Sequence, residues 1–219
     1  MPAVAILPIK SLEKAKTRLA LEMSAELRRA PAQAMFADVL AALRRADQVS
    51  EIVVVSSDDG VRQTALDDGA EVLKDSVTGH NDAAAVGIAR AIGKGVARVL
   101  LVPGDCPLLT PSELDALIAR PCAPRSAVIV PDRHGTGTNA LLLTPPSVVM
   151  PSFGPGSKER HVRLAQRQGS PPEVVAVPGL ALDVDTPEDL AALRSALAGT
   201  SGGAAHNARH SRPVRAKWA

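Results

Sequence analysis

The amino-acid sequence predicts an α/β fold in which helices flank a mostly parallel, Rossmann-like β-sheet. Between residues 3 and 103, apolar strand-like runs alternate with segments of helical spacing, which is the order of elements in β-α-β units. The strand-like runs are apolar at consecutive positions, as expected for strands that are covered on both faces. Open sheets of this kind bind ligands outside the carboxyl ends of their strands. The residues that follow each strand are therefore the first candidates for a functional site.

The first half of the chain has the most regular pattern. Short apolar runs predict four strands, at residues 3–9, 51–57, 70–74 and 98–103. Apolar residues at helical spacing predict three helices, at residues 25–46, 59–69 and 81–95. A polar loop over residues 10–18, which carries four cations, joins the first strand to the first helix.

The second half is less regular. It predicts three further strands, at residues 126–132, 140–146 and 173–185. Residues 133–139 are expected to form a glycine turn. Residues 152–161 are expected to form a loop in which Ser157 caps a short helix.

The end of the chain predicts one more helix and a tail. The helix is expected to begin at Thr186-Pro187, because proline is favoured at the first helical position, and to stop at Gly199. The residues after it lack periodicity and contain several Arg and Lys. We therefore expect one domain over residues 1–198 and a flexible basic tail over residues 199–219.

Composition excludes several classes of function. The net charge is +2 and aromatic residues make up 1% of the chain, with no Tyr, so we expect no nucleic-acid partner. No apolar run approaches the ~20 residues of a membrane span, and no signal sequence precedes the first strand. Two cysteines are too few for a disulfide framework or a four-ligand zinc site. We expect a cytoplasmic protein with no membrane partner, and the sequence leaves its oligomeric state open.

The stretch RVLLVPGDCPLLTPSEL presents a carboxylate directly after a strand. Asp105 follows the strand predicted at residues 98–103. The sequence from Thr110 to Glu113 predicts a capping box, with Pro111 at the first helical position. Asp105 therefore lies in a tight strand-to-helix loop and is expected to face the ligand crevice, where it can stay solvated or hold a metal ion.

The stretch ALDVDTPEDL repeats this arrangement of strand, acid and helix start. Asp183 and Asp185 alternate along the predicted strand, so only one of them is expected to share a site with Asp105. Two carboxylates at neighbouring strand ends repel each other unless a cation lies between them. Mg²⁺ is suited to such a site, because it binds one or two carboxylates together with substrate phosphates. The alternative is that one or both acids are solvated helix caps.

The loop after the first strand is placed to hold phosphates. Lys10 and Lys16 are the first candidates for contacts with phosphate, and Arg18 is the third. The loop lacks the GxxxxGK[ST] pattern of a P-loop and the glycine fingerprint of a dinucleotide-binding fold. The alternative is a solvated basic loop.

Two glycine-containing segments, at residues 135–139 and 154–157, offer small residues and hydroxyls that let a backbone approach an anion. Each is otherwise an ordinary turn. The sequence contains no GxSxG nucleophile elbow and no HExxH spacing. His134 and His161 lie near these segments and are candidates for contacts there, although solvated loop histidines are the commoner case.

Five blocks of the sequence together resemble a known family. In order they are LPIKSLEKAKTRLA, VPGDCPLLTPSEL, PDRHGTGTNALLL, FGPGSKERH and LDVDTPEDL. The combination is similar to the CofC and FbiD guanylyltransferases of coenzyme F-420 biosynthesis, and the resemblance spans roughly residues 3–195. The last block alone also occurs in related nucleotidyltransferases.

The resemblance implies a single-domain nucleotidyltransferase fold of the GT-A type. It also implies transfer of GMP from GTP to phosphoenolpyruvate or 2-phospho-L-lactate, with release of pyrophosphate. By this resemblance Asp105 and Asp183 are expected to bind Mg²⁺, and Lys10 and Lys16 to contact the GTP phosphates. Thr138, Gly154 and Ser157 are expected to contact the small acid, and Asn81 to contact guanine.

The resemblance is weakest in the base pocket and leaves other functions open. His80 stands where an apolar residue is expected before Asn81. One alternative is a nucleotidyltransferase with another base or acceptor, such as a cytidylyltransferase or a molybdopterin-nucleotide enzyme. Another is a non-catalytic nucleotide-binding module, although such a module has less need of both Asp105 and Asp183.

Overall fold

The computed structural model of the chain describes residues 1–10, 25–74 and 79–203. Its seven-stranded sheet has the order β3-β2-β1-β4-β6-β5-β7. The strands are β1 (Ala3–Ile9), β2 (Val49–Ser56), β3 (Glu71–Lys74), β4 (Val99–Leu101), β5 (Ser126–Pro131), β6 (Thr138–Thr144) and β7 (Pro172–Val174). The helices are α1 (Ala25–Arg45), α2 (Asp59–Asp67), α3 (His80–Gly93), α4 (Pro111–Ile118), α5 (Ser157–Arg167), α6 (Pro178–Ala181) and α7 (Pro187–Gly203).

Most strand pairs in this sheet are parallel, as the sequence predicts. β1 pairs in parallel with β2 on one side and with β4 on the other, and β2 pairs in parallel with β3. β6 is the exception, because it runs antiparallel to both β4 and β5. The chain order of the strands reverses between β1 and β4. Such a switch point is where open α/β sheets form their ligand crevice.

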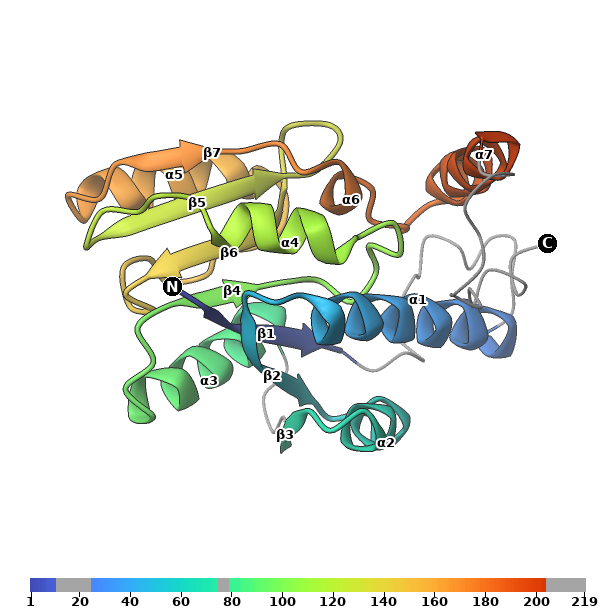
Figure 1. Cartoon of the computed structure of the whole chain (residues 1–219), viewed down its shortest axis with the longest axis horizontal. Coiled ribbons are helices and arrows are strands. Elements are labelled where there is room, and N and C mark those ends of the chain that lie inside the picture. The colour runs from blue at the N-terminus through green and yellow to red at the C-terminus, as the bar shows by residue number, and fades with distance from the viewer. Residues whose placement is uncertain (11–24, 75–78, 204–219) are drawn as a thin grey trace.

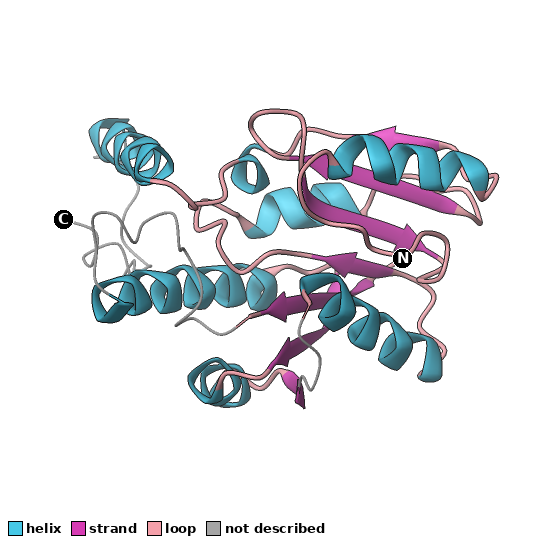
Figure 2. Ribbon diagram, turned by 180° about the vertical axis from the view of Figure 1, so that it is seen from behind, coloured by secondary structure: helices cyan, strands magenta, loops and turns pink. Residues whose placement is uncertain are grey.

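Helices cover both faces of the sheet. Figure 1 shows α1 and α4 on one face, and Figure 2, seen from behind, shows α3 and α5 on the other. Each layer is filled by a buried apolar cluster, one containing Phe36 of α1 and Leu114 of α4, the other containing Ile88 of α3 and Ala165 of α5. Alternate residues of β1 enter the two clusters. This explains why the sequence of β1 is apolar at every position.

The predicted strand over residues 173–185 is wrong. β7 ends at Val174, and a helical turn, α6, follows it. The segment is apolar because Leu180 and Val184 are buried in the cluster shared with α1 and α4, and not because it extends the sheet. Pro178 at the first position of α6 is the local signal for this turn.

The last helix is longer than predicted, because α7 continues past Gly199 to Gly203. Residues 204–219 lie outside the described residues, so the flexible basic tail stays a prediction. Within the described part of the chain, no helix has both the length and the apolar character needed to cross a bilayer.

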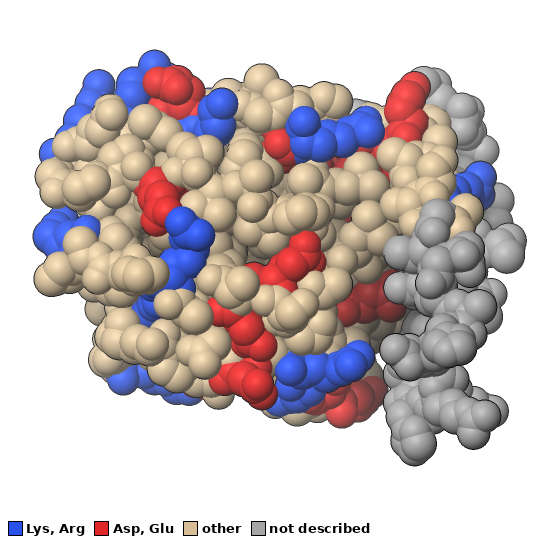
Figure 3. All heavy atoms as spheres, turned by 45° about the horizontal axis from the view of Figure 1, so that its top comes forward, with Lys and Arg blue, Asp and Glu red and all other residues tan. Residues whose placement is uncertain are grey.

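Charged side chains of both signs are interspersed on the face shown in Figure 3. Elsewhere on the surface, Lys94 bridges Glu51 and Glu71 at 2.6 and 2.9 Å, and Arg90 also contacts Glu71 at 2.7 Å. Because charges of both signs are mixed on the face shown in Figure 3, that face has no broad basic surface of the kind that attracts nucleic acids.

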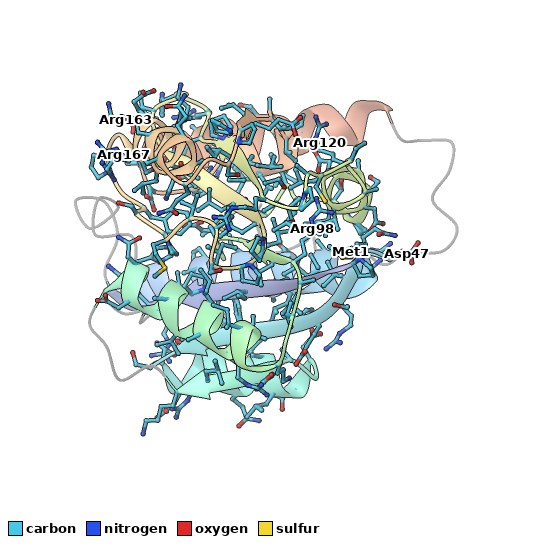
Figure 4. All side chains as sticks on the ribbon, turned by 90° about the vertical axis from the view of Figure 1, so that its left-hand side faces the viewer. Met1, Asp47, Arg98, Arg120, Arg163 and Arg167 are labelled. Atoms are coloured by element: carbon cyan, nitrogen blue, oxygen red, sulfur yellow. The ribbon has the colours of Figure 1, made fainter. Side chains whose placement is uncertain are left out.

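α4 is held at both of its ends. The predicted capping box is present, since the Thr110 side chain accepts from the Glu113 amide, and Glu113 Oε2 accepts from the Thr110 amide at 3.0 Å. The other oxygen, Glu113 Oε1, accepts a hydrogen bond from the Gly179 amide at 2.8 Å and so ties α6 to α4. Figure 4 shows Arg98 next to the other end of α4, where its Nη1 donates to the Ile118 carbonyl at 2.6 Å. A cation there meets the negative end of the helix dipole.

We expect Gly179→Ala to destabilise the protein. A Cβ at this position would lie 2.3 Å from Glu113 Oε2 and 2.8 Å from both the Leu108 carbonyl oxygen and Leu109 Cα. Two of these atoms are backbone, so the segment must shift. Overpacking of this kind costs about 1–3 kcal/mol, which urea denaturation would show as a lower free energy of unfolding.

Gly93→Ala is the matched control. It lies at the end of α3 with open space around the added Cβ, and Ala is the better helix former. Its free energy of unfolding should stay the same or rise. Equal stability of the two variants would show that α6 is not packed tightly against the loop before α4.

Candidate active site

A cavity of about 470 Å³ lies at the switch point of the sheet. Its lining comes from the ends of β1 and β4, the start of α3, the loop between β5 and β6 with the start of β6, and the segments around the start of α5 and before α7. The predicted site residues among its lining are Asp105, Thr138, Gly154, Ser157 and Asp183. The fold therefore brings together groups that are far apart in the sequence.

Asp105 and Asp183 meet in this cavity, as the sequence predicts. The Val184 amide donates to the Asp105 carbonyl oxygen at 3.2 Å, which ties the two acidic segments together. Burial raises the pKa of Asp183, and the charge of Asp105 raises it further. Asp185 also lines the cavity, so the expectation that only one of the two later acids faces the site is wrong. The alternation rule fails because these residues follow α6 and are not in a strand.

Asn139 holds Asp183 in place. Its Nδ2 donates to the Leu180 carbonyl at 2.7 Å and to Asp183 Oδ1 at 3.3 Å. Asn139 is nearly buried in β6, so these bonds form in a protected environment. Sequence reasoning did not select Asn139 as a site residue. Its position next to Thr138 in the block GTGTN was the available signal.

The helix that follows Asp183 and Asp185 is also capped. Asp189 Oδ2 accepts hydrogen bonds from the amides of Asp185 and Thr186, at 3.0 and 2.8 Å. Its other oxygen pairs with Arg133 at 2.6 Å. Because Arg133 belongs to the loop between β5 and β6, this ion pair fastens the start of α7 to a second wall of the cavity.

The predicted glycine turn at residues 133–139 ends earlier than expected, because β6 begins at Thr138. Asp132 closes the turn by accepting hydrogen bonds from the amides of Thr136 and Gly137, each at 3.0 Å. A Cβ on Gly137 would lie 2.5 Å from Asp132 Oδ2, so the closed turn requires glycine. The turn delivers the Thr138 side chain to the cavity.

The prediction that Ser157 caps a helix is wrong, because Ser157 is the first residue of α5. Gly156 is the capping residue, and it has a left-handed backbone with φ of 68°. Gly154 also has a positive φ, 116°, which favours glycine at both positions. The Ser157 hydroxyl is buried, lines the cavity and has no hydrogen-bond partner among the described residues.

His161 is fully buried, so the commoner case of a solvated loop histidine does not apply to it. Its Nδ1 lies 2.9 Å from Thr138 Oγ1, and its Nε2 accepts a hydrogen bond from the Ser152 amide at 2.9 Å. Burial lowers the pKa of His161 to about 4, and the charge of Arg160 acts in the same direction. His134, in contrast, is exposed, and it lines the cavity.

The remaining predicted residues lie at the edge of the cavity or outside the described chain. Lys10 is exposed directly after β1. Burial lowers the pKa of His80, a cavity residue, while the charges of Asp105 and Lys10 act on it in opposite directions. Lys16 and Arg18 lie outside the described residues. The roles of Lys10, Lys16 and Arg18 in binding phosphate stay predictions.

Asn81 makes its contacts to the loop that precedes α5. Its Oδ1 accepts from the Phe153 amide at 2.6 Å, and its Nδ2 donates to the Phe153 carbonyl at 3.3 Å. Both ends of the side-chain amide therefore hold the backbone of a residue that lines the cavity. Its predicted contact with guanine stays a prediction.

The site offers a metal ion only a few oxygen ligands from the described side chains. Among the described residues, no group of three or more His, Cys, Asp or Glu is arranged as a metal site. Asp105 and Asp183 form a close pair, and Asp183 has a raised pKa because of burial and of Asp105. This donor set fits Mg²⁺, which uses one or two carboxylates and completes its shell with phosphates and water.

Residues 3–204 match the family model described as guanylyl transferase CofC like. The chain belongs to this family. A phosphoenolpyruvate guanylyltransferase of Conexibacter woesei is 49% identical over 214 residues, which cover 94% of this chain and 93% of that protein. A phosphoenolpyruvate guanylyltransferase of Sphaerobacter thermophilus is 38% identical and covers 87% of this chain and 91% of that protein. The CofC-like chain is therefore a nucleotidyltransferase enzyme.

Solved structures confirm the fold of this CofC-like enzyme. A putative nucleotide-diphospho-sugar transferase from Desulfovibrio desulfuricans has a TM-score of 0.68 at 17% identity, covering 88% of this chain and 87% of that one. A 4-diphosphocytidyl-2C-methyl-D-erythritol synthase has a TM-score of 0.62 at 16% identity, covering 90% of this chain and 99% of that one. At these identities the likeness shows the fold alone.

We expect Asp183→Asn to raise the thermal midpoint of unfolding at pH 7 in metal-free buffer. The substitution removes a half-buried charge that burial and Asp105 both disfavour, and an amide oxygen can still accept from Asn139. The wild type should lose stability as the pH rises through the folded pKa of Asp183, and the variant should not. Asp67→Asn, an exposed site, is the control and should change little. A lower midpoint for Asp183→Asn would contradict the repulsion.

We expect His161 to make stability depend on pH. An unfolded chain protonates this ring near its ordinary pKa of 6.5, whereas the folded protein does so only at about 4. Between these values the unfolded state binds more protons, so stability falls as the pH falls. From pH 7.5 to 5 the contribution of His161 is a loss of about 2 kcal/mol. Urea denaturation of wild type and His161→Gln at both pH values measures it, and equal losses in the two proteins would contradict it.

Proposed function

We propose that this enzyme transfers GMP from GTP to the phosphate of phosphoenolpyruvate and releases pyrophosphate. The family description supports the guanylyl group, and the names of the two relatives support the acceptor. The observation that carries the proposal is the meeting of Asp105 and Asp183 in a cavity that Thr138 and Ser157 also line. One wall of this cavity suits a cation and another wall suits an anion.

The reaction joins two phosphates, so charge is its main difficulty. An oxygen of the acceptor phosphate attacks the α-phosphorus of GTP, and the bond from that phosphorus to the pyrophosphate oxygen breaks. The attacking oxygen is already ionised at neutral pH, so no strong general base is needed. We assign Asp105 and Asp183 as the ligands of Mg²⁺, which, when bound, supplies positive charge against the transferred and leaving phosphates.

The chain's own cations and hydroxyls position the two substrates. We assign Lys10 and Lys16 to the GTP phosphates, with Arg18 as a further contact, because their loop follows β1 at the switch point. Thr138, Gly154 and Ser157 hold the carboxylate and phosphate of the small acid, since they offer hydroxyls and a close backbone approach.

We further propose that the product serves coenzyme F-420 biosynthesis and that the enzyme works in the cytoplasm. The first statement follows from the resemblance of the sequence blocks. The second is supported by Cys106 and Cys122, neither of which is in a disulfide, as suits a reducing compartment. The alternative acceptor is 2-phospho-L-lactate, which has a saturated, tetrahedral carbon where phosphoenolpyruvate has a double bond.

Pyrophosphate release decides the proposal. Purified protein with Mg²⁺, GTP and phosphoenolpyruvate should release pyrophosphate, and replacing GTP by CTP or ATP should abolish most of the signal. Replacing phosphoenolpyruvate by 2-phospho-L-lactate tests the acceptor. If pyrophosphate appears with CTP and not with GTP, the enzyme is a nucleotidyltransferase of another base.

We expect Asp105→Asn to lower kcat by at least about a hundredfold, the size of effect seen when a preorganised electrostatic group is removed. Its thermal midpoint in metal-free buffer should be no lower than that of wild type, because the change is nearly isosteric and removes the charge that raises the pKa of Asp183. Asp67→Asn, on the exposed side of α2, is the matched control and should keep full activity. An active but unfolding-prone Asp105→Asn would instead identify Asp105 as a structural residue.

A further inference from the structure

His161 lies behind one wall of the cavity and does not line it. The ring is fully buried, and the edge of Phe153 packs against it with ring centroids 5.4 Å apart. Its two nitrogens contact Thr138 Oγ1 and the Ser152 amide, each at 2.9 Å. A buried histidine with both nitrogens engaged has a defined proton arrangement, and the two partners determine which one.

The Ser152 contact fixes the tautomer of His161. A backbone N–H can only donate, so Nε2 of His161 must accept and cannot carry a proton. In the neutral ring the proton is therefore on Nδ1. The contact between Nδ1 and Thr138 Oγ1 is then a hydrogen bond donated by the histidine to the hydroxyl oxygen.

This direction has a consequence for Thr138. A threonine hydroxyl has one hydrogen and two acceptor positions. Because His161 uses one acceptor position, the hydroxyl hydrogen is directed elsewhere. Thr138 lines the cavity, so its hydrogen is available to a ligand there. The Ser157 hydroxyl, buried and without a partner among the described residues, lines the same cavity.

The same histidine holds the loop that carries this wall. Ser152 precedes the cavity residues Phe153 and Gly154, and its carbonyl oxygen accepts from Arg160 Nη2 at 2.9 Å. Arg160 is the charged group that acts on His161. Through Ser152 and Thr138, one ring therefore connects the loop before α5 to the start of β6.

We infer that His161 is a positioning residue that makes Thr138 an obligatory hydrogen-bond donor toward the anionic acceptor substrate. The inference rests on the proposed function for the identity of that substrate, phosphoenolpyruvate. It adds a specificity rule: this wall favours a group that only accepts hydrogen bonds, such as a carboxylate or an ionised phosphate. It also predicts that His161 acts through Thr138 and not on the nucleotide.

The key variant is His161→Gln, because the glutamine amide oxygen can reach the Ser152 amide as Nε2 does, while the donor at the Nδ1 position is lost. We expect its KM for phosphoenolpyruvate to rise about tenfold, as when a hydrogen bond to a charged group is weakened. Its KM for GTP should change by less than about twofold. Gln166→Ala, an exposed position on the same helix, is the control and should leave both constants unchanged.

A double-mutant cycle separates positioning from general structural support. Thr138→Val removes the hydroxyl, so the added effect of His161→Gln on the KM for phosphoenolpyruvate should vanish in that background. Independent, multiplying effects would overturn the inference. So would a rise in the KM for GTP as large as that for the acid.

A second measurement is made on the wild-type protein, and a variant serves only to assign the His161 signal. Nitrogen chemical shifts of ¹⁵N-histidine-labelled protein at pH 7, assigned by comparison with His161→Asn or His161→Gln, should show a neutral His161 with its proton on Nδ1. A proton on Nε2 would overturn the inference.

Failure of the proposed function gives a different result. If wild type releases no pyrophosphate with GTP and phosphoenolpyruvate, the function is wrong. Calorimetric binding of phosphoenolpyruvate, and of inorganic phosphate, to wild type and His161→Gln then tests the inference together with the tautomer. Tenfold weaker binding by the variant supports it, and equal binding or no binding by either protein overturns it.

Discussion

The repulsion between Asp105 and Asp183 is the constraint on which the rest of the site depends. The two carboxylates lie 78 positions apart in the sequence, and the charge of one raises the pKa of the other. A folded chain that holds like charges together must stabilise the segments that carry them by other means. Here the Val184 amide binds the Asp105 carbonyl, and Asn139 donates to Asp183. These hydrogen bonds hold the segments that carry Asp105 and Asp183 in place despite the repulsion between the two carboxylates.

Two helix-capping carboxylates near the cavity also hold distant segments together. Glu113 caps the first turn of α4 and also binds α6, while Asp189 caps the first turn of α7 and also pairs with Arg133. In both cases a helix-capping carboxylate has a second partner in a distant segment. Because each carboxylate bonds to a helix start and to a second segment, it ties the two segments together. The contacts that hold the starts of α4 and α7 therefore also help to hold the preceding segments, which carry Asp105 and Asp183.

Much of the fold could be predicted from the sequence, because its strands are continuous apolar runs and because α4 and α7 begin with a recognisable Thr-Pro pair. The pairing of Asp105 with Asp183 could be predicted from their repeated local pattern. The segment at residues 173–185 could not, because a buried coil and a buried strand have the same composition. The environment of His161 could not either, since its partners Thr138 and Ser152 are set by tertiary packing, 23 and 9 residues away. Asn81 likewise meets Phe153 across 72 residues.

The position of β6 between β4 and β5 has a consequence for how the enzyme acquires its binding site during synthesis. The strands β1 to β4 have all been synthesised once the first hundred or so residues have emerged from the ribosome. The wall with Thr138 requires β6, and the second acid arrives only with the residues before α7. A nascent or prematurely terminated chain would thus contain Asp105 without Asp183 and would lack the acidic pair.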